Sequence, residues 1–136
     1  MALVAVSIVG AESLPAEAFR KGGAALAARL EIHALGHLHR ESGLAGMAAV
    51  LRTRVGPHAL EALLERLSLE SGEISFHLLS YGALVYRDES LSVPPPGVAN
   101  LRGALRSLAE LDPGFEIPTL GNVSTHLRDA SNRHPL

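Results

Sequence analysis

The sequence contains no cysteine and no tryptophan, and aromatic residues make up only 4% of its 136 positions. Without cysteine the chain has no disulfide, no thiolate zinc site, no iron–sulfur cluster and no cysteine nucleophile. A basic excess is also missing, since the formal net charge is -2. We therefore expect no nucleic-acid partner, because sequence-independent binding to nucleic acid depends on many Lys and Arg side chains.

Long apolar runs are missing as well. The apolar start from Ala2 to Val9 is too short to cross a bilayer, and no basic residue precedes it as in a secretion signal. We expect a first β-strand here, no membrane partner and a cytoplasmic protein. With 47% hydrophobic residues, the chain is typical of one soluble domain over residues 1–136, with a tail over 131–136.

Apolar periodicity predicts three strands and two helices in the first 81 residues. The strands cover about 3–9, 47–55 and 73–81, and the helices cover about 15–30 and 57–71. Ser13 is the expected cap of the first helix. The segment 31–40 fits a helix with His33 and His37 on one face, or a strand with His33, Leu35, His37 and His39 on one face. We favour the strand.

The resulting order is β-α-β-β-α-β, which predicts an α/β (α+β) protein with a ferredoxin-like antiparallel sheet. A smaller C-terminal part follows. Leu84–Tyr86 and Leu91–Val93 predict a short hairpin, Asn100 is the expected cap of a helix that reaches Leu111, and a last short helix spans Val123–Ala130.

Short motifs follow one another in a set order in the second half of the chain: Ser80-Tyr81-Gly82, Leu91–Pro96, Leu108–Pro113 and Ile117-Pro118. In order and spacing they resemble the C-terminal half of the hydroxymethyldihydropterin pyrophosphokinases of folate biosynthesis. Upstream, 48–50 and 59–67 look like the third strand and second helix of that family. The resemblance implies a single pyrophosphokinase-like domain, and in the family this domain transfers pyrophosphate from ATP to 6-hydroxymethyl-7,8-dihydropterin.

The positions that the resemblance assigns to catalysis have changed. In the family two aspartates on the fourth strand bind two magnesium ions, and Ser75 and His77 stand there in this chain. Magnesium prefers carboxylate and water oxygens, so this pair does not replace the aspartates. The substrate-binding positions have changed too. The family has an aromatic residue and an asparagine where this chain has Ala45 and Met47, and a histidine and an arginine where it has Pro95 and Leu101.

The resemblance therefore implies a relative that has lost catalysis, needs no cofactor and acts as a binding or assembly protein. The alternative is a divergent active pyrophosphokinase that uses magnesium and ATP with relocated residues such as Arg87, Arg102 and His77. The two readings differ in whether the fold has an open cleft lined by arginine and carboxylate. No ligand follows from the sequence.

Histidines on the second strand raise the question of a metal site. His37 and His39 have the ligand chemistry for zinc, but His77 falls on the opposite edge of a ferredoxin-like sheet, so we expect no metal site within one chain. The short turns at 41–43 and 71–72 leave Leu44, Met47 and Leu79 with less cover than in the family. We expect a homodimer through the second strand, in which the histidines meet their symmetry mates.

Overall fold

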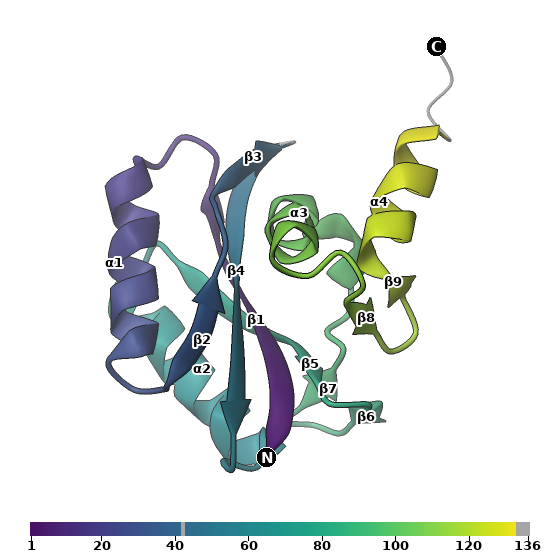
Figure 1. Ribbon diagram of the computed structural model, residues 1–136. Helices are drawn as coiled ribbons and strands as arrows, with labels where there is room; N and C mark the ends of the chain where they lie inside the picture. Colours follow the sequence, from purple (N-terminus) through teal and green to yellow (C-terminus); the bar gives the residue numbers. More distant parts are fainter. Residues whose placement is uncertain (42, 133–136) are drawn as a thin grey trace.

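The computed structural model describes residues 1–41 and 43–132, with an antiparallel sheet of five strands at its centre (Figure 1). The long strands are β1 (Ala2–Ala11), β4 (Leu44–Thr53) and β5 (Ser75–Tyr81), and the short ones are β2 (Ile32–Leu35) and β3 (His39–Glu41). The order across the sheet is β2-β4-β1-β5, with β3 also paired to β4. This is the predicted ferredoxin-like arrangement, and the fold prediction is confirmed.

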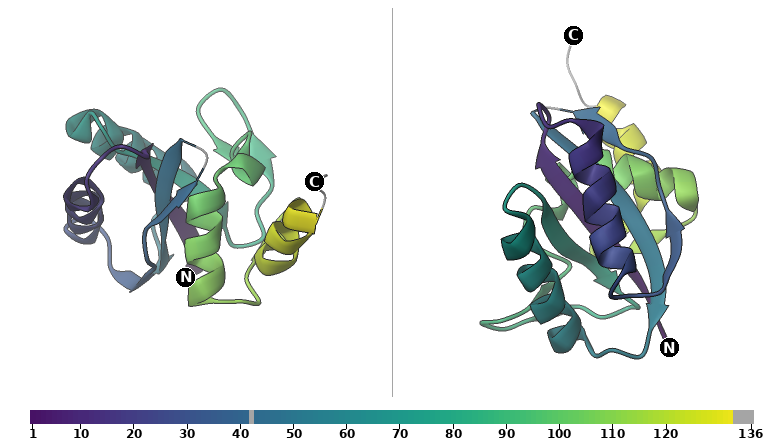
Figure 2. Two further views of the ribbon diagram at one scale, coloured as in Figure 1. Left: turned by 90° about the horizontal axis from the view of Figure 1, so that it is seen from above. Right: turned by 90° about the vertical axis from the view of Figure 1, so that its left-hand side faces the viewer.

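Helices α1 (Ala16–Ala27) and α2 (Pro57–Ser71) form the two crossovers and lie on the same face of the sheet (Figure 2). Pro57 opens α2 as expected, because proline suits the first helical turn. The expected cap of α1 is wrong: Pro15 holds the N-cap position and no side chain caps the helix. Ser13 lies two residues too early, since the chain needs an extended residue immediately before the first helical turn.

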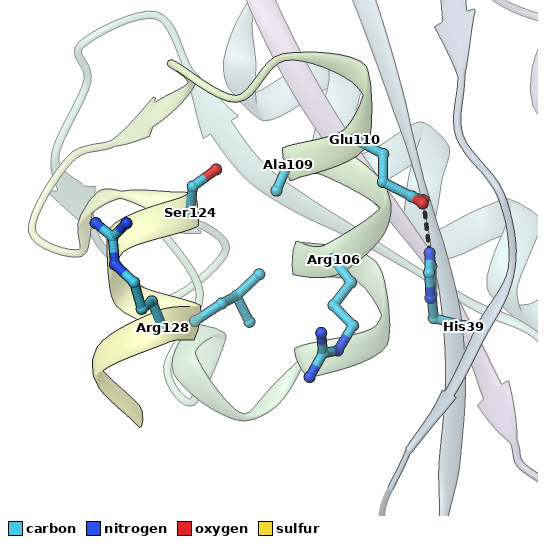
Figure 3. A pocket seen from close by; sticks show the side chains of 7 residues that line it. His39, Arg106, Ala109, Glu110, Ser124 and Arg128 are labelled. Atoms are coloured by element: carbon cyan, nitrogen blue, oxygen red, sulfur yellow. Dashed lines mark hydrogen bonds and ion pairs between the residues drawn. The ribbon is translucent and has the colours of Figure 1, made fainter. Parts of the chain in front are cut away.

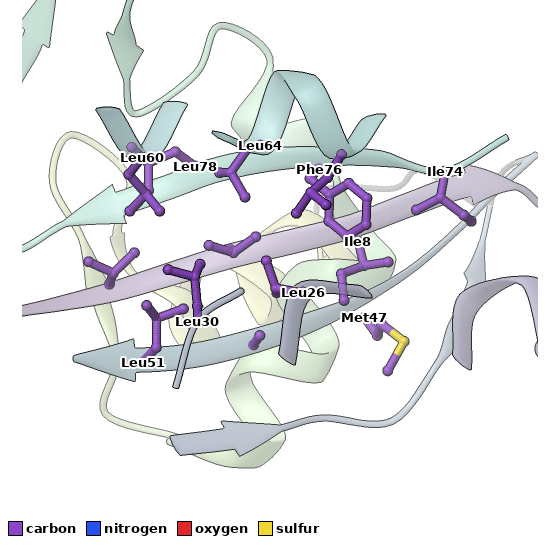
Figure 4. Close-up of a cluster of buried hydrophobic side chains, with 14 of the residues drawn as sticks. Ile8, Leu26, Leu30, Met47, Leu51, Leu60, Leu64, Ile74, Phe76 and Leu78 are labelled. Atoms are coloured by element: carbon purple, nitrogen blue, oxygen red, sulfur yellow. The ribbon is translucent and has the colours of Figure 1, made fainter. Parts of the chain in front are cut away.

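The core between the sheet and these helices is aliphatic (Figure 4). Even-numbered residues of β1 and odd-numbered residues of β4 point into it, because successive side chains of a strand alternate between faces. Leu60, Leu64 and Leu67 of α2 close the cluster at a helical spacing. Each fully buried leucine contributes about 1.5–3 kcal/mol to the free energy of unfolding.

The opposite face of the sheet is covered by the C-terminal part, which Figure 1 shows on the other side from α1 and α2. Its elements are the hairpin β6 (Tyr86–Arg87) and β7 (Ser92–Val93), the 3-10 turn η1 (Val98–Asn100), α3 (Arg102–Leu111), the hairpin β8 (Glu116–Ile117) and β9 (Gly121–Asn122), and α4 (Val123–Asn132). The second core holds Ala48, Leu79, Leu105, Leu108 and Leu127.

Two boundaries in this part differ from the prediction. Asn100 does not cap α3, because it ends the preceding 3-10 turn and Leu101 stands before the helix without a side-chain hydrogen bond. The expected tail begins too early, since α4 continues through Asn132. Residues 133–136 lie outside the described residues.

The predicted strand 31–40 is interrupted. β2 ends at Leu35 and β3 begins at His39, and Gly36 to Leu38 leave the ladder between them. Gly36 still donates its N–H to the carbonyl of Ala48 at 2.8 Å, but the N–H of Ala48 donates to Oγ of Ser107 on α3, at 2.9 Å. A side chain of α3 thus replaces the strand carbonyl that a continuous ladder would supply.

Glycines allow α3 to approach the sheet this closely. A Cβ on Gly103 would lie 2.6 Å from the carbonyl oxygen of His39, and a Cβ on Gly46 would lie 2.9 Å from the backbone nitrogen of Ala104. Backbone therefore meets backbone at this crossing, which fixes α3 against β3 and β4. No helix in the described ranges, 1–41 and 43–132, has both the length and the apolar character needed to span a bilayer.

Candidate functional site

Ser75 and His77 lie on β5, as predicted, and both point to the face of the sheet that the C-terminal part covers. The register pairs His77 with Ser7 and Phe76 with Ile8, and Phe76 and Ile8 belong to the opposite core. Ser75 is exposed and His77 is half-buried. Alternate residues therefore share a face here, as the resemblance requires of its metal-binding pair.

Ala45 and Met47 do not join them. Both belong to the core beneath α1 and α2, where Ala45 is 1% and Met47 7% exposed. Met47 pairs with Ile8, so it points to the face opposite His77. Pyrophosphoryl transfer needs both substrates on one side of the sheet, because the reacting atoms must meet. The two sets of matched positions therefore do not form one site.

Pro95 does meet His77. Both line a hollow of about 250 Å³ between β5, α2 and the segment from Asp88 to Pro96, and four carboxylates surround it, those of Glu61, Glu65, Asp88 and Glu89. Neither lysine nor arginine is among the described residues that line this hollow. We call it the acidic hollow.

Asp88 organises the turn beside the acidic hollow. One carboxylate oxygen accepts hydrogen bonds from the backbone N–H groups of Ser90 and Leu91, and the other accepts from the Tyr86 hydroxyl at 2.7 Å and lies 2.8 Å from Nε2 of His58. The hydrogen bond to His58, followed by those to Tyr86 and Ser90, lowers the pKa of Asp88 far below its usual range. Both oxygens are occupied by the protein.

Burial changes the charge state of two other groups at the acidic hollow. Desolvation raises the pKa of Glu61, and the neighbouring Glu65 carboxylate raises it further. Desolvation also lowers the pKa of His77, so its imidazole stays neutral at pH 7. A hydroxyl and a neutral imidazole do not fit magnesium, whose ligands are hard, charged oxygens. Ser75 and His77 therefore do not rebuild the family's metal site.

Leu101, Arg102 and Arg87 lie apart from His77. Leu101 packs on the second core, and Nε of Arg102 lies 3.7 Å from Oε2 of Glu41, at the edge of the sheet that β3 occupies. Arg87 lines a separate hollow with Val85 and Val93. The active-enzyme alternative relies on Arg87, Arg102 and His77. These three residues do not converge on one hollow.

His37 lies in the gap before β3 and His39 begins β3, and both side chains approach Glu110 of α3. Nε2 of His39 lies 2.6 Å from Oε1 of Glu110, and Nδ1 of His37 lies 4.0 Å from the same oxygen. The hydrogen bond with His39 lowers the pKa of the Glu110 carboxyl. In the part of the chain that the structure describes, no three His, Asp or Glu side chains are grouped so that they hold a metal ion.

A second hollow, of about 380 Å³, lies beside His39 and was not predicted (Figure 3). Its lining comes from β3, α3 and α4 and contains two arginines and one carboxylate, the combination that the active-enzyme alternative expects of its cleft: His39, Arg106, Ala109, Glu110, Ser124, Leu127 and Arg128. We call it the α3–α4 hollow. It lies by the β3 edge of the sheet, away from Ser75 and His77 on β5.

The sequence contained one signal for this hollow. Arg102, Arg106 and Glu110 recur every four residues, which places them on one face of a helix. The sequence alone does not reveal its meaning, because the partner carboxylate, Glu41, is far away in the sequence. Nε of Arg106 donates to Oε1 of Glu41 at 2.8 Å.

No family model matches this sequence, and a search of curated proteins finds no match.

Proposed function

We propose that the protein is a non-catalytic relative of the hydroxymethyldihydropterin pyrophosphokinases that acts as a binding or assembly protein. The observation that supports this best is the acidic hollow at His77. Four carboxylates line it, and no lysine or arginine in the described part of the chain does. A triphosphate placed there would meet negative charge on several sides.

The physical argument concerns charge neutralisation. Phosphoryl and pyrophosphoryl transfer depend on positioning together with cations that stabilise the charge on the phosphate oxygens. Ser75 is uncharged, and burial keeps His77 neutral. The Asp88 carboxylate is already occupied by His58, Tyr86 and two backbone N–H groups.

The test is an assay of AMP release from ATP with magnesium and 6-hydroxymethyl-7,8-dihydropterin. We expect no AMP above the rate without protein. Ser75→Asp with His77→Asp restores the carboxylate pair and is the informative variant. We expect it to remain inactive, since added negative charge in the acidic hollow brings no arginine for the phosphates. Turnover by the natural sequence, with matching pterin diphosphate, would establish the alternative, a divergent active pyrophosphokinase.

For assembly, we propose a homodimer of the cytoplasmic protein through the β2 edge. The sheet ends at β2, where Leu35 is 45% exposed, and an unpaired strand edge favours association with another strand. The expected exposure of three apolar residues is wrong for two of them, since Met47 and Leu79 are buried and Leu44 is exposed. Met47 lies under the helices and Leu79 under the C-terminal part.

Light scattering at micromolar concentration tests this assembly. We expect twice the monomer mass for the natural sequence and the monomer mass for Leu35→Lys, which places a charge at the edge. Leu69→Lys is the matched control, because Leu69 is 83% exposed on α2 and lies away from β2. A monomer mass for the natural sequence would contradict the dimer.

A further inference from the structure

The α3–α4 hollow has the size and the two-part lining of a small-molecule site. Its volume of about 380 Å³ falls in the range of ligand pockets, roughly 300–1,000 Å³. Ala109 and Leu127 supply an apolar surface, and Arg106, Ser124 and Arg128 supply polar groups around it. Figure 3 shows that these side chains come from two facing helices, with Ala109 directed into the space between them.

Positive charge exceeds negative charge around the α3–α4 hollow. Arg102 and Arg106 share the single carboxylate of Glu41, at 3.7 Å and 2.8 Å from their Nε atoms. Arg128 makes no hydrogen bond or ion pair with any described residue. Three guanidinium groups therefore face two carboxylates, those of Glu41 and Glu110.

The carboxylate that lines the hollow is turned away from it. Oε1 of Glu110 lies 2.6 Å from Nε2 of His39, and in Figure 3 this contact is on the side of α3 that faces β3 rather than α4. Arg106 uses only its Nε toward Glu41, so its terminal nitrogens have no partner among the described residues. The donors left for a ligand are thus the terminal nitrogens of Arg106 and the whole guanidinium of Arg128.

We propose that the α3–α4 hollow binds a small organic acid, with its oxyanion on the unpaired guanidinium of Arg128 and its apolar body on Ala109 and Leu127, while Arg106 adds positive charge from the facing helix. Guanidinium groups bind carboxylate and phosphate through pairs of parallel N–H donors, which suits either acid. The apolar surface between the helices favours an acid with a hydrocarbon or aromatic part over a bare inorganic ion. The inference does not depend on the proposed loss of catalysis, because this hollow lies by the edge of the sheet opposite His77.

The experiment is an NMR titration of the complete, isotopically labelled chain with millimolar probes. Phenyl phosphate and benzoate represent the two kinds of organic acid. Benzyl alcohol has the apolar body without the charge, and inorganic phosphate has the charge without the body. We expect saturable shifts of backbone amides in 106–110 and 124–128 with at least one of the two acids, and weaker binding of both control probes.

Two variants test the two halves of the proposed site. Arg128→Gln removes an unpaired guanidinium, and we expect binding to weaken by about fivefold or more, as for loss of a charge-assisted hydrogen bond. Ala109→Leu fills the apolar surface and should weaken binding by a similar factor. Arg66→Gln, at an exposed arginine of α2 that makes no hydrogen bond or ion pair with another described residue, is the matched control and should leave binding unchanged.

Several outcomes would overturn the proposal. They are no saturable shift with either acid, shifts confined to other parts of the chain, and unchanged affinity in Arg128→Gln or Ala109→Leu while the spectrum remains that of the folded chain. An affinity for benzyl alcohol equal to that for the two acids would overturn the inference that the ligand is an anion. An affinity for inorganic phosphate equal to that for the two acids would overturn the inference that the ligand has an apolar part.

Discussion

The hydroxyl of Ser107 on α3 accepts a hydrogen bond from the backbone N–H of Ala48 on β4, at 2.9 Å. Both residues are fully buried. The contact lies at the gap between β2 and β3, where β4 has no strand neighbour to accept this N–H. One side chain therefore joins the C-terminal part to the sheet and satisfies a donor that water does not reach.

Ser107→Ala should destabilise the protein by about 1–3 kcal/mol, because it leaves the Ala48 N–H buried without an acceptor. Chemical denaturation measures the change in the free energy of unfolding. Ser80→Ala is the matched control: Ser80 is equally buried, and its hydroxyl has no hydrogen-bond partner within the described residues. We expect the control to change stability by less than about 0.5 kcal/mol or to increase it. Equal losses in the two variants would contradict the role of Ser107.

Gly103→Ala should destabilise the protein by about 1–3 kcal/mol, although alanine is the better helix former. The added methyl group would lie 2.6 Å from the carbonyl oxygen of His39 and 3.0 Å from the nitrogen of Gly46, and neither is a side chain that rotates away. Gly114→Ala is the control, since its nearest atom is Oδ1 of Asp112 at 3.5 Å. Thermal unfolding of both variants checks the prediction, and a Gly103→Ala variant as stable as the natural sequence would contradict the close crossing.

The fold followed from the sequence because its signals are local. Apolar runs give β1 and β4, and the leucines of α2 recur at a helical spacing. The break in the strand 31–40 did not follow from it. Only the approach of Ser107, far away in the sequence, allows Gly36 and the residues after it to leave the ladder.

The candidate site was less predictable, because it depends on contacts between residues that are far apart in the sequence. Ser75 and His77 share a face because alternation along one strand is local. Whether Met47 joins them depends on the register between β1 and its two neighbours, and this register places Met47 on the other face. The α3–α4 hollow depends on how two helices meet, which no periodicity specifies.

Tyr86 should titrate above the usual tyrosine pKa of about 10. Its hydroxyl donates to the Asp88 carboxylate, which raises the pKa of Tyr86 by stabilising the protonated phenol and repelling the phenolate. The stabilisation from this contact is present below the usual tyrosine pKa and is lost as pH rises through the higher pKa of the folded state. Phenolate absorbance in a Tyr81→Phe background isolates the titration of Tyr86, because the chain has two tyrosines.

Asp88→Asn should move the pKa of Tyr86 back toward its usual value, since a neutral amide repels the phenolate less. Glu89→Gln is the matched control, because it removes an adjacent carboxylate that makes no hydrogen bond to Tyr86. We expect the titration of Tyr86 to stay unchanged in this control. A pKa of Tyr86 that is the same in Asp88→Asn and in the natural sequence would contradict the contact.

His77 should titrate below the usual histidine pKa of about 6.5, because burial disfavours its charged form. Between that value and the lower pKa of the folded state, the unfolded chain binds a proton that the folded chain does not. The titration of His77 therefore lowers the free energy of unfolding as pH falls through this interval. Above the interval this loss is absent. The imidazole proton resonance that disappears in His77→Gln identifies the titration by NMR.

The same variant tests the consequence for stability. His77→Gln should reduce the loss of unfolding free energy between neutral and mildly acidic pH, since glutamine takes up no proton there. Ser75→Ala is the control, because Ser75 lies on the same face of β5 and does not titrate. We expect it to leave the titration of His77 and the pH dependence of stability unchanged. A His77 resonance that titrates at or above the usual value would contradict the effect of burial on the pKa of His77.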